Sequence, residues 1–306
     1  MAKTLEPITH IQMRRLALVR HLYDLGVQQS RGPEPTSALA LLPFHDAAEM
    51  YLLLACERHD AGGKRPDFME YFTYLEGAGI AFSERESMRR MNKARVAIKH
   101  NGVLPAAVDV EGFRQSTTNF LHNNAQIAFG IDFDRISLVS LIQHEGIRRS
   151  LEAAEKALAD GKIGDALAKA TAAFALLIAG THHAPRPISE ESPYSLRSAA
   201  LRGFSHFDAR RVGDGLEAKK LGEAVVSSAE VFSEAITLIG HGLDFTRYLQ
   251  FKMYAPVAML MMDGSVTIQQ MRTPTSDPIA GRECVAFVVD TAIRLEQGAQ
   301  RTLPLA

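Results

Sequence analysis

Apolar residues recur at intervals of three and four positions through most of this chain, and Gly and Pro residues separate the segments that carry the pattern. This period matches one face of an α-helix, because a helix advances about 100° per residue. In residues 8–29, for example, Ile11, Leu18, Leu22 and Leu25 recur at helical spacing. We therefore predict a mainly helical, all-α fold. The expected helices cover residues 8–29, 43–59, 67–76, 83–101, 110–128, 137–159, 163–179, 216–252 and 282–297.

Short polar motifs predict where some of these helices begin. Ser83 followed by Glu86 has the spacing of a capping box, and Asp109 is placed to cap the following helix. Before the last helix, β-branched residues on either side of Asp263-Gly264 predict a small β-hairpin near 257–270.

A chain of 306 residues is long enough for two domains of ordinary size. We expect a helical domain over residues 1–133 and a second helical domain over residues 134–306, to which no motif assigns a role. The formal net charge is −1, so no global field draws the molecule to nucleic acid. Any such binding has to come from local patches of charge.

Several classes of protein are disfavoured by what the sequence lacks. It has no Walker loop, no dinucleotide glycine pattern, no Gly-x-Ser-x-Gly elbow and no Cys-x2-Cys pair, and we expect no cofactor. Cys56 and Cys284 lie far apart in apolar segments and are expected to be buried free thiols, which suits a reducing compartment. Because the N-terminus has no apolar signal core and no apolar run approaches ~18–20 residues, we expect a cytoplasmic protein without a membrane partner.

The segment from Ser87 to Gly102 combines the residues best suited to chemistry on a phosphate. Between Arg85 and Asn101 the chain has six Lys or Arg residues and one acid. Within this run, Arg95 and His100 are separated by four residues. An arginine can neutralise a phosphate and a histidine can move a proton near neutral pH, so the pair is a candidate for cutting RNA without a metal.

The positions of Arg95 and His100 on a helix leave alternatives open. Arg95 shares the apolar stripe of Met88, Met91 and Ile98, where a charge is costly unless it is paired. It is therefore either a structural cation tied to a carboxylate or a sheltered phosphate ligand. His100 lies about 140° from Arg95 on an ideal helix. The two can converge only if the last turn loosens or if two chains contribute to one cleft.

The Arg-x4-His spacing, with its Lys-His-Asn-Gly exit, resembles the HEPN family of helical proteins over roughly residues 7–130. The resemblance implies a metal-independent endoribonuclease with Arg95 and His100 as catalytic residues, in the role of a toxin or defence effector. It also implies a homodimer in which two such helices line one cleft. RNA would be the substrate, cut by attack of its own 2′-hydroxyl, and DNA would not be cleaved.

One position departs from the family pattern. Active members usually carry a polar residue directly after the arginine, whereas this chain has Val96. Asn92 or Asn101 could supply the missing polar group. The alternative function is a non-catalytic HEPN-like module that binds RNA, a nucleotide or a protein partner.

Other polar residues are candidates for supporting this site. Asp46 and Glu49, in the segment that starts at Phe44-His45, could hold Arg95 or His100 in place, and Lys99 and Asn101 flank the histidine. His45 and Glu49 are four apart on one helical face, but no third metal ligand is signalled nearby, so no metal is expected. An exposed His–Glu pair is the alternative.

The residues expected to contact RNA are cations on either side of the chain's midpoint. They are Arg89 and Lys93 in the motif helix, and Arg197 and Arg202 in a later basic and aromatic stretch. The pair His182-His183, in a proline-rich stretch, could bind a metal, but an isolated pair of histidines is a weak signal.

Overall fold

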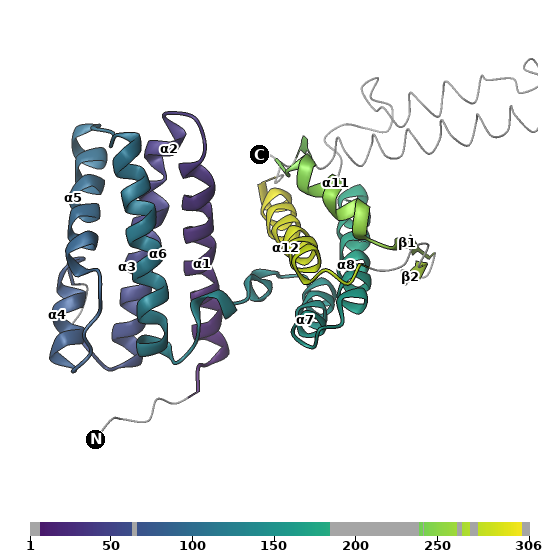
Figure 1. Cartoon of the computed structure of the whole chain (residues 1–306), viewed down its shortest axis with the longest axis horizontal. Helices are drawn as coiled ribbons and strands as arrows, with labels where there is room; N and C mark the ends of the chain where they lie inside the picture. Colours follow the sequence, from purple (N-terminus) through teal and green to yellow (C-terminus); the bar gives the residue numbers. More distant parts are fainter. Residues whose placement is uncertain are drawn as a thin grey trace, which may run out of the picture. The chain divides into compact units, whose positions relative to one another are not determined.

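The protein is mainly helical, as expected, with one small β-hairpin among the residues described (Figure 1). The computed structural model describes residues 7–62, 66–183, 239–240, 242–261, 265–269 and 275–301. Contacts divide the chain into two compact units, Met1–Leu141 and Ile142–Ala306.

The first unit is a helical bundle. Its elements are α1 (His10–Ser30), α2 (Thr36–Leu39), α3 (Leu41–Arg58), α4 (Glu70–Gly77), α5 (Arg85–Asn101), α6 (Ala107–Phe129) and the 3₁₀ turns η1 (Phe133–Arg135) and η2 (Leu138–Leu141). Helix α3 lies at the centre, in contact with α1, α4, α5 and α6. Figure 1 shows the four long helices of this unit running roughly alongside one another.

Aromatic side chains fill the core around α3. Tyr51 is fully buried and packs edge-on against Phe120 and Phe129 at centroid distances of 5.4 and 5.1 Å. A Cβ added to Gly26 of α1 would lie 2.6 Å from the Phe44 ring. The missing side chain therefore lets α1 approach the N-terminal part of α3 closely.

The high apolar content of α2 and α3 has a structural explanation. The segment Thr36–Arg58 is long and apolar enough to cross a membrane by length and composition, with a mean hydropathy of 1.3 in its most apolar window. In this fold, however, 67% of that window is buried inside the protein. A helix at the centre of a core is apolar on most of its faces, which accounts for the composition.

Two expected helix starts are wrong. The residue before α5 is Glu84 in the left-handed conformation (φ 63°), no side chain caps the helix, and Glu86 pairs with Arg89. The Ser83 backbone N–H donates instead to Oδ1 of Asn124, at 2.9 Å. Helix α6 begins at Ala107, so that Asp109 lies in its first turn rather than at its cap.

The division between the units falls later than the expected 133/134, because the two 3₁₀ turns pack against α1. Arg20 donates hydrogen bonds to the backbone carbonyls of Asp134 and Ile136. Phe133 and Ile136 are buried in the core of the first unit. These long-range contacts attach residues 134–141 to the first unit.

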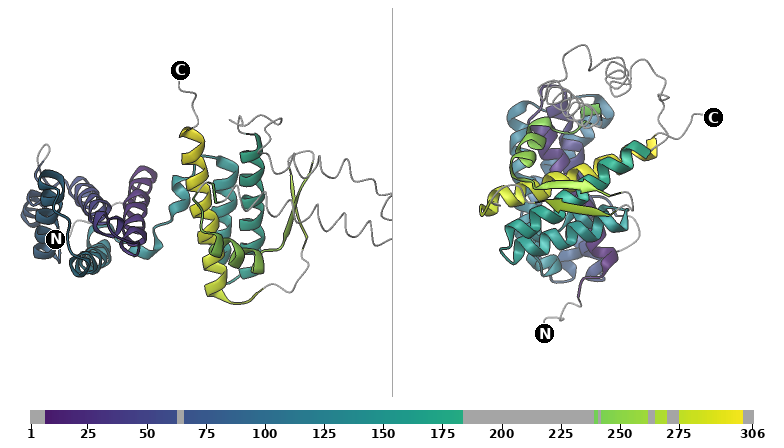
Figure 2. Two further views of the ribbon diagram at one scale, coloured as in Figure 1. Left: turned by 90° about the horizontal axis from the view of Figure 1, so that it is seen from above. Right: turned by 90° about the vertical axis from the view of Figure 1, so that its right-hand side faces the viewer.

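In the part of the second unit that the structure describes, helices and a small hairpin pack around the long helix α8, and the short helix α11 packs against α12. The elements are α7 (Glu145–Ala159), α8 (Ile163–His183), α11 (Phe245–Tyr254), β1 (Val257–Leu260), β2 (Val266–Gln269) and α12 (Pro278–Arg301). The strands pair antiparallel, with Ala258 opposite Ile268, and the hairpin contacts α8 (Figure 2). The expected hairpin near 257–270 is confirmed. Rings from α8, α11 and α12 meet where Phe174 packs on Phe251 and Phe287.

Both cysteines are buried free thiols, one in each unit, as expected. Burial raises the pKa of Cys56 and of Cys284 to about 11. Neither thiol is ionised near neutral pH, so neither is a reactive nucleophile.

Candidate functional site

The motif lies on one uninterrupted helix, α5. That helix stays regular to Asn101 and ends at Gly102, which has a left-handed conformation (φ 67°). The Gly102 N–H donates to the Ile98 carbonyl at 3.1 Å, the normal α-helical pattern. The last turn therefore does not loosen, and Arg95 and His100 stay about 140° apart. Of the two arrangements considered, only a cleft shared by two chains would bring both residue types together.

Arg95 lies on the inner side of α5. It is half-buried beside the fully buried Met88 and Met91. Its Nε atom is buried and has no hydrogen-bond partner, and the structure shows no ion pair within 4 Å for its guanidinium in the part of the chain it describes. A buried N–H without a partner is costly. The structural reading, in which a carboxylate ties Arg95 down, is not what the contacts show.

His100 lies on the outer side of the last turn. The side chains of His100, Lys99 and Asn101 are all exposed. Within the residues described, none of the three makes a side-chain hydrogen bond or ion pair. Asp46 and Glu49, expected to support the motif, come closest to His45 rather than to Arg95 or His100.

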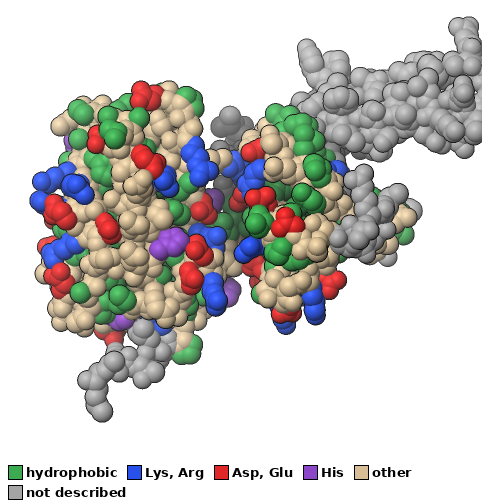
Figure 3. All heavy atoms as spheres, in the orientation of Figure 1, with side chains coloured by type: hydrophobic (Ala, Val, Ile, Leu, Met, Phe, Trp, Pro, Cys, Tyr) green, Lys and Arg blue, Asp and Glu red, His purple; other side chains and the backbone are tan. Residues whose placement is uncertain are grey.

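The cations of α5 divide into two groups. Near its start, Arg85 pairs with Glu76 and Arg89 pairs with Glu86, each at 2.6 Å. Further along, Lys93, Arg95 and Lys99 have no ion pair among the residues that the structure describes. Figure 3 shows basic and acidic side chains interleaved at the edge of the bundle where α4 and α5 lie. Among the described residues Arg90 makes no ion pair either and contacts only the Ser87 hydroxyl, so positive charge without an ion pair extends from Arg90 to Lys99, whereas Arg89 is engaged by Glu86.

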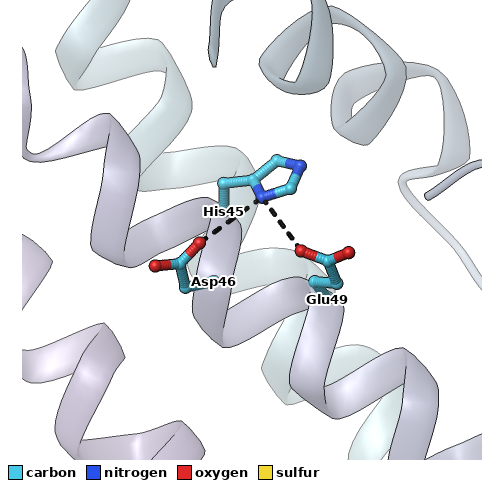
Figure 4. Close-up of side chains that lie close together, drawn as sticks. All are labelled: His45, Asp46 and Glu49. Atoms are coloured by element: carbon cyan, nitrogen blue, oxygen red, sulfur yellow. Dashed lines mark ion pairs between the residues drawn. The ribbon is translucent and has the colours of Figure 1, made fainter. Parts of the chain in front are cut away.

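A polar cluster on α3 faces this half of α5. His45 is 1% exposed, its ring packs on Phe68 at a centroid distance of 4.4 Å, and its Nε2 lies 3.0 Å from Oδ1 of Asn92 on α5. On the other side of the ring, Nδ1 lies 3.6 Å from Glu49 Oε2 and 3.8 Å from Asp46 Oδ1 (Figure 4). The expectation of an exposed His–Glu pair is therefore wrong with respect to His45, which is buried, whereas Glu49 is partly exposed.

Asp46 of this cluster interacts electrostatically with cations of α5. The His45 ring holds the pKa of Asp46 below its ordinary value of 3.8, and Lys99 and Arg95 lower that pKa further. Partial burial of the carboxyl acts in the opposite direction. Asp46 is thus within electrostatic range of both motif cations without forming a pair with Arg95. It can screen their positive charge, and an arriving phosphate would compete with it.

Sequence reasoning missed the central place of His45 and Asn92. The available signal was the helical spacing of His45 from Leu41, Ala48 and Leu52 of α3, which are all buried, because this spacing places the His45 ring on the same face. Asn92 lies four residues after the buried Met88 and is therefore close to the inner face of α5. The link between them joins residues that are far apart in the sequence, so no local pattern could have shown it.

The remaining candidate residues cannot be placed. Arg197 and Arg202 lie outside the residues that the structure describes, and so does the turn at Asp263-Gly264. His182 and His183 end α8, and their side chains are likewise outside the description.

Comparison of the chain with protein-family models, with curated proteins and with solved structures finds no match in any of the three.

Proposed function

We propose that the first unit is a HEPN-like endoribonuclease that cuts RNA without a metal and acts as a homodimer. The observation that carries the proposal is Arg95, a half-buried cation whose Nε has no partner, at motif spacing from an exposed histidine. A guanidinium held in this way is preorganised for an anion, because binding a phosphate supplies the hydrogen bonds that the protein leaves unmade.

The proposed reaction is an internal transesterification. The ribose 2′-hydroxyl attacks the adjacent phosphorus while His100 takes its proton, and Arg95 stabilises the charge that develops on the phosphorane oxygens. The bond from phosphorus to the 5′-oxygen then breaks. That oxygen takes up the proton that His100 accepted, which leaves a 2′,3′-cyclic phosphate on one product and a 5′-hydroxyl on the other.

The homodimer is needed because one regular helix cannot present both groups to one phosphate. In a two-fold arrangement, two α5 helices would lie side by side, so that the half-buried Arg95 of one copy comes close to the exposed His100 of the other. The unpaired cations Lys93 and Lys99 would then border the shared groove and attract the RNA backbone.

Cleavage of labelled RNA in EDTA tests this proposal. We expect products that end in a 2′,3′-cyclic phosphate, and no cleavage of a deoxyribose oligonucleotide of the same sequence, because DNA lacks the nucleophile. A chain that leaves RNA intact under these conditions, or that cuts the DNA control equally well, would contradict the mechanism.

The second candidate is a non-catalytic binding module. Val96, which takes the place of the polar residue usual after the family arginine, is 43% exposed. Exposed apolar residues continue past the end of α5 at Val103, Leu104 and Val108. Such a run favours contact with a partner rather than with solvent. A shift of labelled RNA without cleavage would favour this candidate.

A further inference from the structure

The His45 ring presents a buried nitrogen to two carboxylates. Its Nδ1 has no hydrogen-bond partner, although the side chain is 1% exposed. The close-up in Figure 4 shows Nδ1 directed at Asp46 and Glu49, which come from the same face of α3. A buried polar atom is normally satisfied, so this nitrogen calls for a partner that lies between the three side chains.

The opposite ring nitrogen determines what that partner is. Nε2 lies 3.0 Å from Oδ1 of Asn92, an amide oxygen that can only accept. Nε2 therefore carries a hydrogen, and Nδ1 faces the two carboxylates either with a second proton or with a lone pair. A lone pair that faces two negative oxygens is repelled by them unless a cation lies between. Metal-bound histidines commonly have this arrangement, in which one nitrogen is fixed by a hydrogen bond and the other is free to coordinate.

We propose that His45 Nδ1, Asp46 and Glu49 bind one divalent transition-metal ion of the zinc class, with Asn92 orienting the histidine. Candidate ligand atoms of the three residues lie within 4.8 Å of one another, and Nδ1 is 3.6 and 3.8 Å from the two oxygens. Tetrahedral ligands about 2.0–2.2 Å from zinc are about 3.3–3.6 Å apart. Small rotations of the carboxylates, which are 53% and 42% exposed, would close the difference.

The donor set selects the class of ion. One imidazole nitrogen and two carboxylate oxygens suit zinc and its neighbours, whereas magnesium and calcium prefer oxygen alone. Three protein ligands leave the fourth position for water or an anion, because the two carboxylates lie at the surface of α3. The third ligand that the sequence did not signal is Asp46.

Two nearby cations set the expected strength of the site. Lys99 and Arg95 act on Asp46 electrostatically, so they would also repel a divalent ion beside it. We therefore expect Lys99→Gln to tighten metal binding. The site does not depend on the proposed nuclease, whose cleavage is assayed in EDTA, so either proposal can fail without the other.

Calorimetric titration of the metal-free full-length protein with zinc chloride tests the proposal, and cobalt(II) absorption reports the ligand geometry. Glu49→Gln and Asp46→Asn keep the shape of the side chains and should each weaken binding at least about tenfold, and Asn92→Ala about 10–100-fold. Glu111→Gln removes an exposed carboxylate from α6 and should leave the affinity unchanged.

Thermal melts of each metal-free variant show whether it is folded, and the two exposed carboxylates keep the test valid even if a change at buried His45 unfolds the chain. Absence of zinc binding would overturn the proposal, since the cation beside Nδ1 would then be a proton. Zinc binding that survives both Glu49→Gln and Asp46→Asn would overturn it as well, because the ion would be held elsewhere in the chain.

Discussion

Nε2 of His45 lies 3.0 Å from Oδ1 of Asn92, and this contact joins the central helix α3 to the motif helix α5. The bond fixes the histidine ring one turn from Arg95, because Asn92 and Arg95 are three residues apart on the same helix. The carboxylates of α3 and the cations of α5 are therefore held in one neighbourhood by a contact from the interior of the bundle.

Replacing His100 with alanine should abolish RNA cleavage and leave the fold intact. The side chain is exposed and makes no hydrogen bond among the described residues, so its loss should hardly change the melting temperature. General acid–base groups contribute ~10²–10⁴ in rate. Single-turnover cleavage rates measure the effect, with His10→Ala, an exposed histidine of α1, as the control. Equal rates for the parent and His100→Ala would remove His100 from the mechanism.

Replacing Arg95 separates a phosphate ligand from a structural cation. With no carboxylate paired to it in the described structure, Arg95→Ala should cost far less than the ~3–5 kcal/mol expected when one partner of a buried ion pair is removed. Arg95→Lys should keep part of the cleavage activity, because it retains the charge. Urea unfolding measures the stability, and Arg85→Ala, which breaks the exposed pair with Glu76, provides the comparison. Large losses of stability in both Arg95 variants would favour the structural role.

Mixing two inactive variants tests the shared cleft. If each active site takes Arg95 from one copy and His100 from the other, Arg95→Ala mixed with His100→Ala forms heterodimers that contain one intact site. We expect the mixture to recover a measurable part of the cleavage rate, whereas either variant alone stays inactive. Light scattering gives the stoichiometry in parallel. Cleavage by a strict monomer would be incompatible with this arrangement.

Asn124 should contribute to stability through the start of α5. Its buried side chain accepts a hydrogen bond from the Ser83 N–H and donates one to the Phe120 carbonyl at 2.7 Å. Asn124→Ala leaves buried polar groups unsatisfied and should lower the free energy of unfolding by about 1–3 kcal/mol. The neighbouring Asn123 is exposed, so Asn123→Ala should change it by no more than about 0.5 kcal/mol. Chemical unfolding of both variants checks the contrast.

The lowered pKa of Asp46 predicts how its contribution to stability depends on pH. A carboxyl whose pKa is lower in the folded state stabilises the fold at pH values above its ordinary pKa of 3.8, and loses that effect as the pH falls through the folded value. Because the side chain is 53% exposed, solvent limits the effect. In EDTA, Asp46→Asn should be less stable than the parent at neutral pH and equal to it in strong acid. A difference that is constant with pH would contradict this.

Much of the fold follows from local sequence, whereas the site does not. The helices could be predicted because apolar spacing and Gly or Pro breaks act over a few residues, and the hairpin followed from its β-branched residues. The start of α5 could not be predicted in this way. In a capping box the Ser83 N–H would donate to the side chain of Glu86, whereas here it donates to Asn124 on another helix. The unit boundary was misplaced for the same reason, since Arg20 holds carbonyls more than a hundred positions later.

The candidate site divides along the same line. The half-buried position of Arg95 could be predicted from helical spacing, which places Arg95 on the same face as Met88 and Met91. Arg95 has no carboxylate partner among the described residues, because the side chains of Asp46 and Glu49 are directed toward His45. Helical spacing alone does not determine that direction. Burial of His45 itself requires Phe68 from outside α3 and Asn92 from α5, which no helical period can predict.

Because α5 is continuous, the number of residues between Arg95 and His100 fixes the angle between their side chains around the helix axis. No loop between them can absorb an insertion, so one added residue would turn His100 by about 100° and move it about 1.5 Å along the axis. A single inserted or deleted codon between the two positions would thus misdirect the pair while retaining both residues. Lineages that carry this chain could silence the proposed activity by such a change, and an intact four-residue interval is the feature to look for when related sequences are sorted into active and inactive forms.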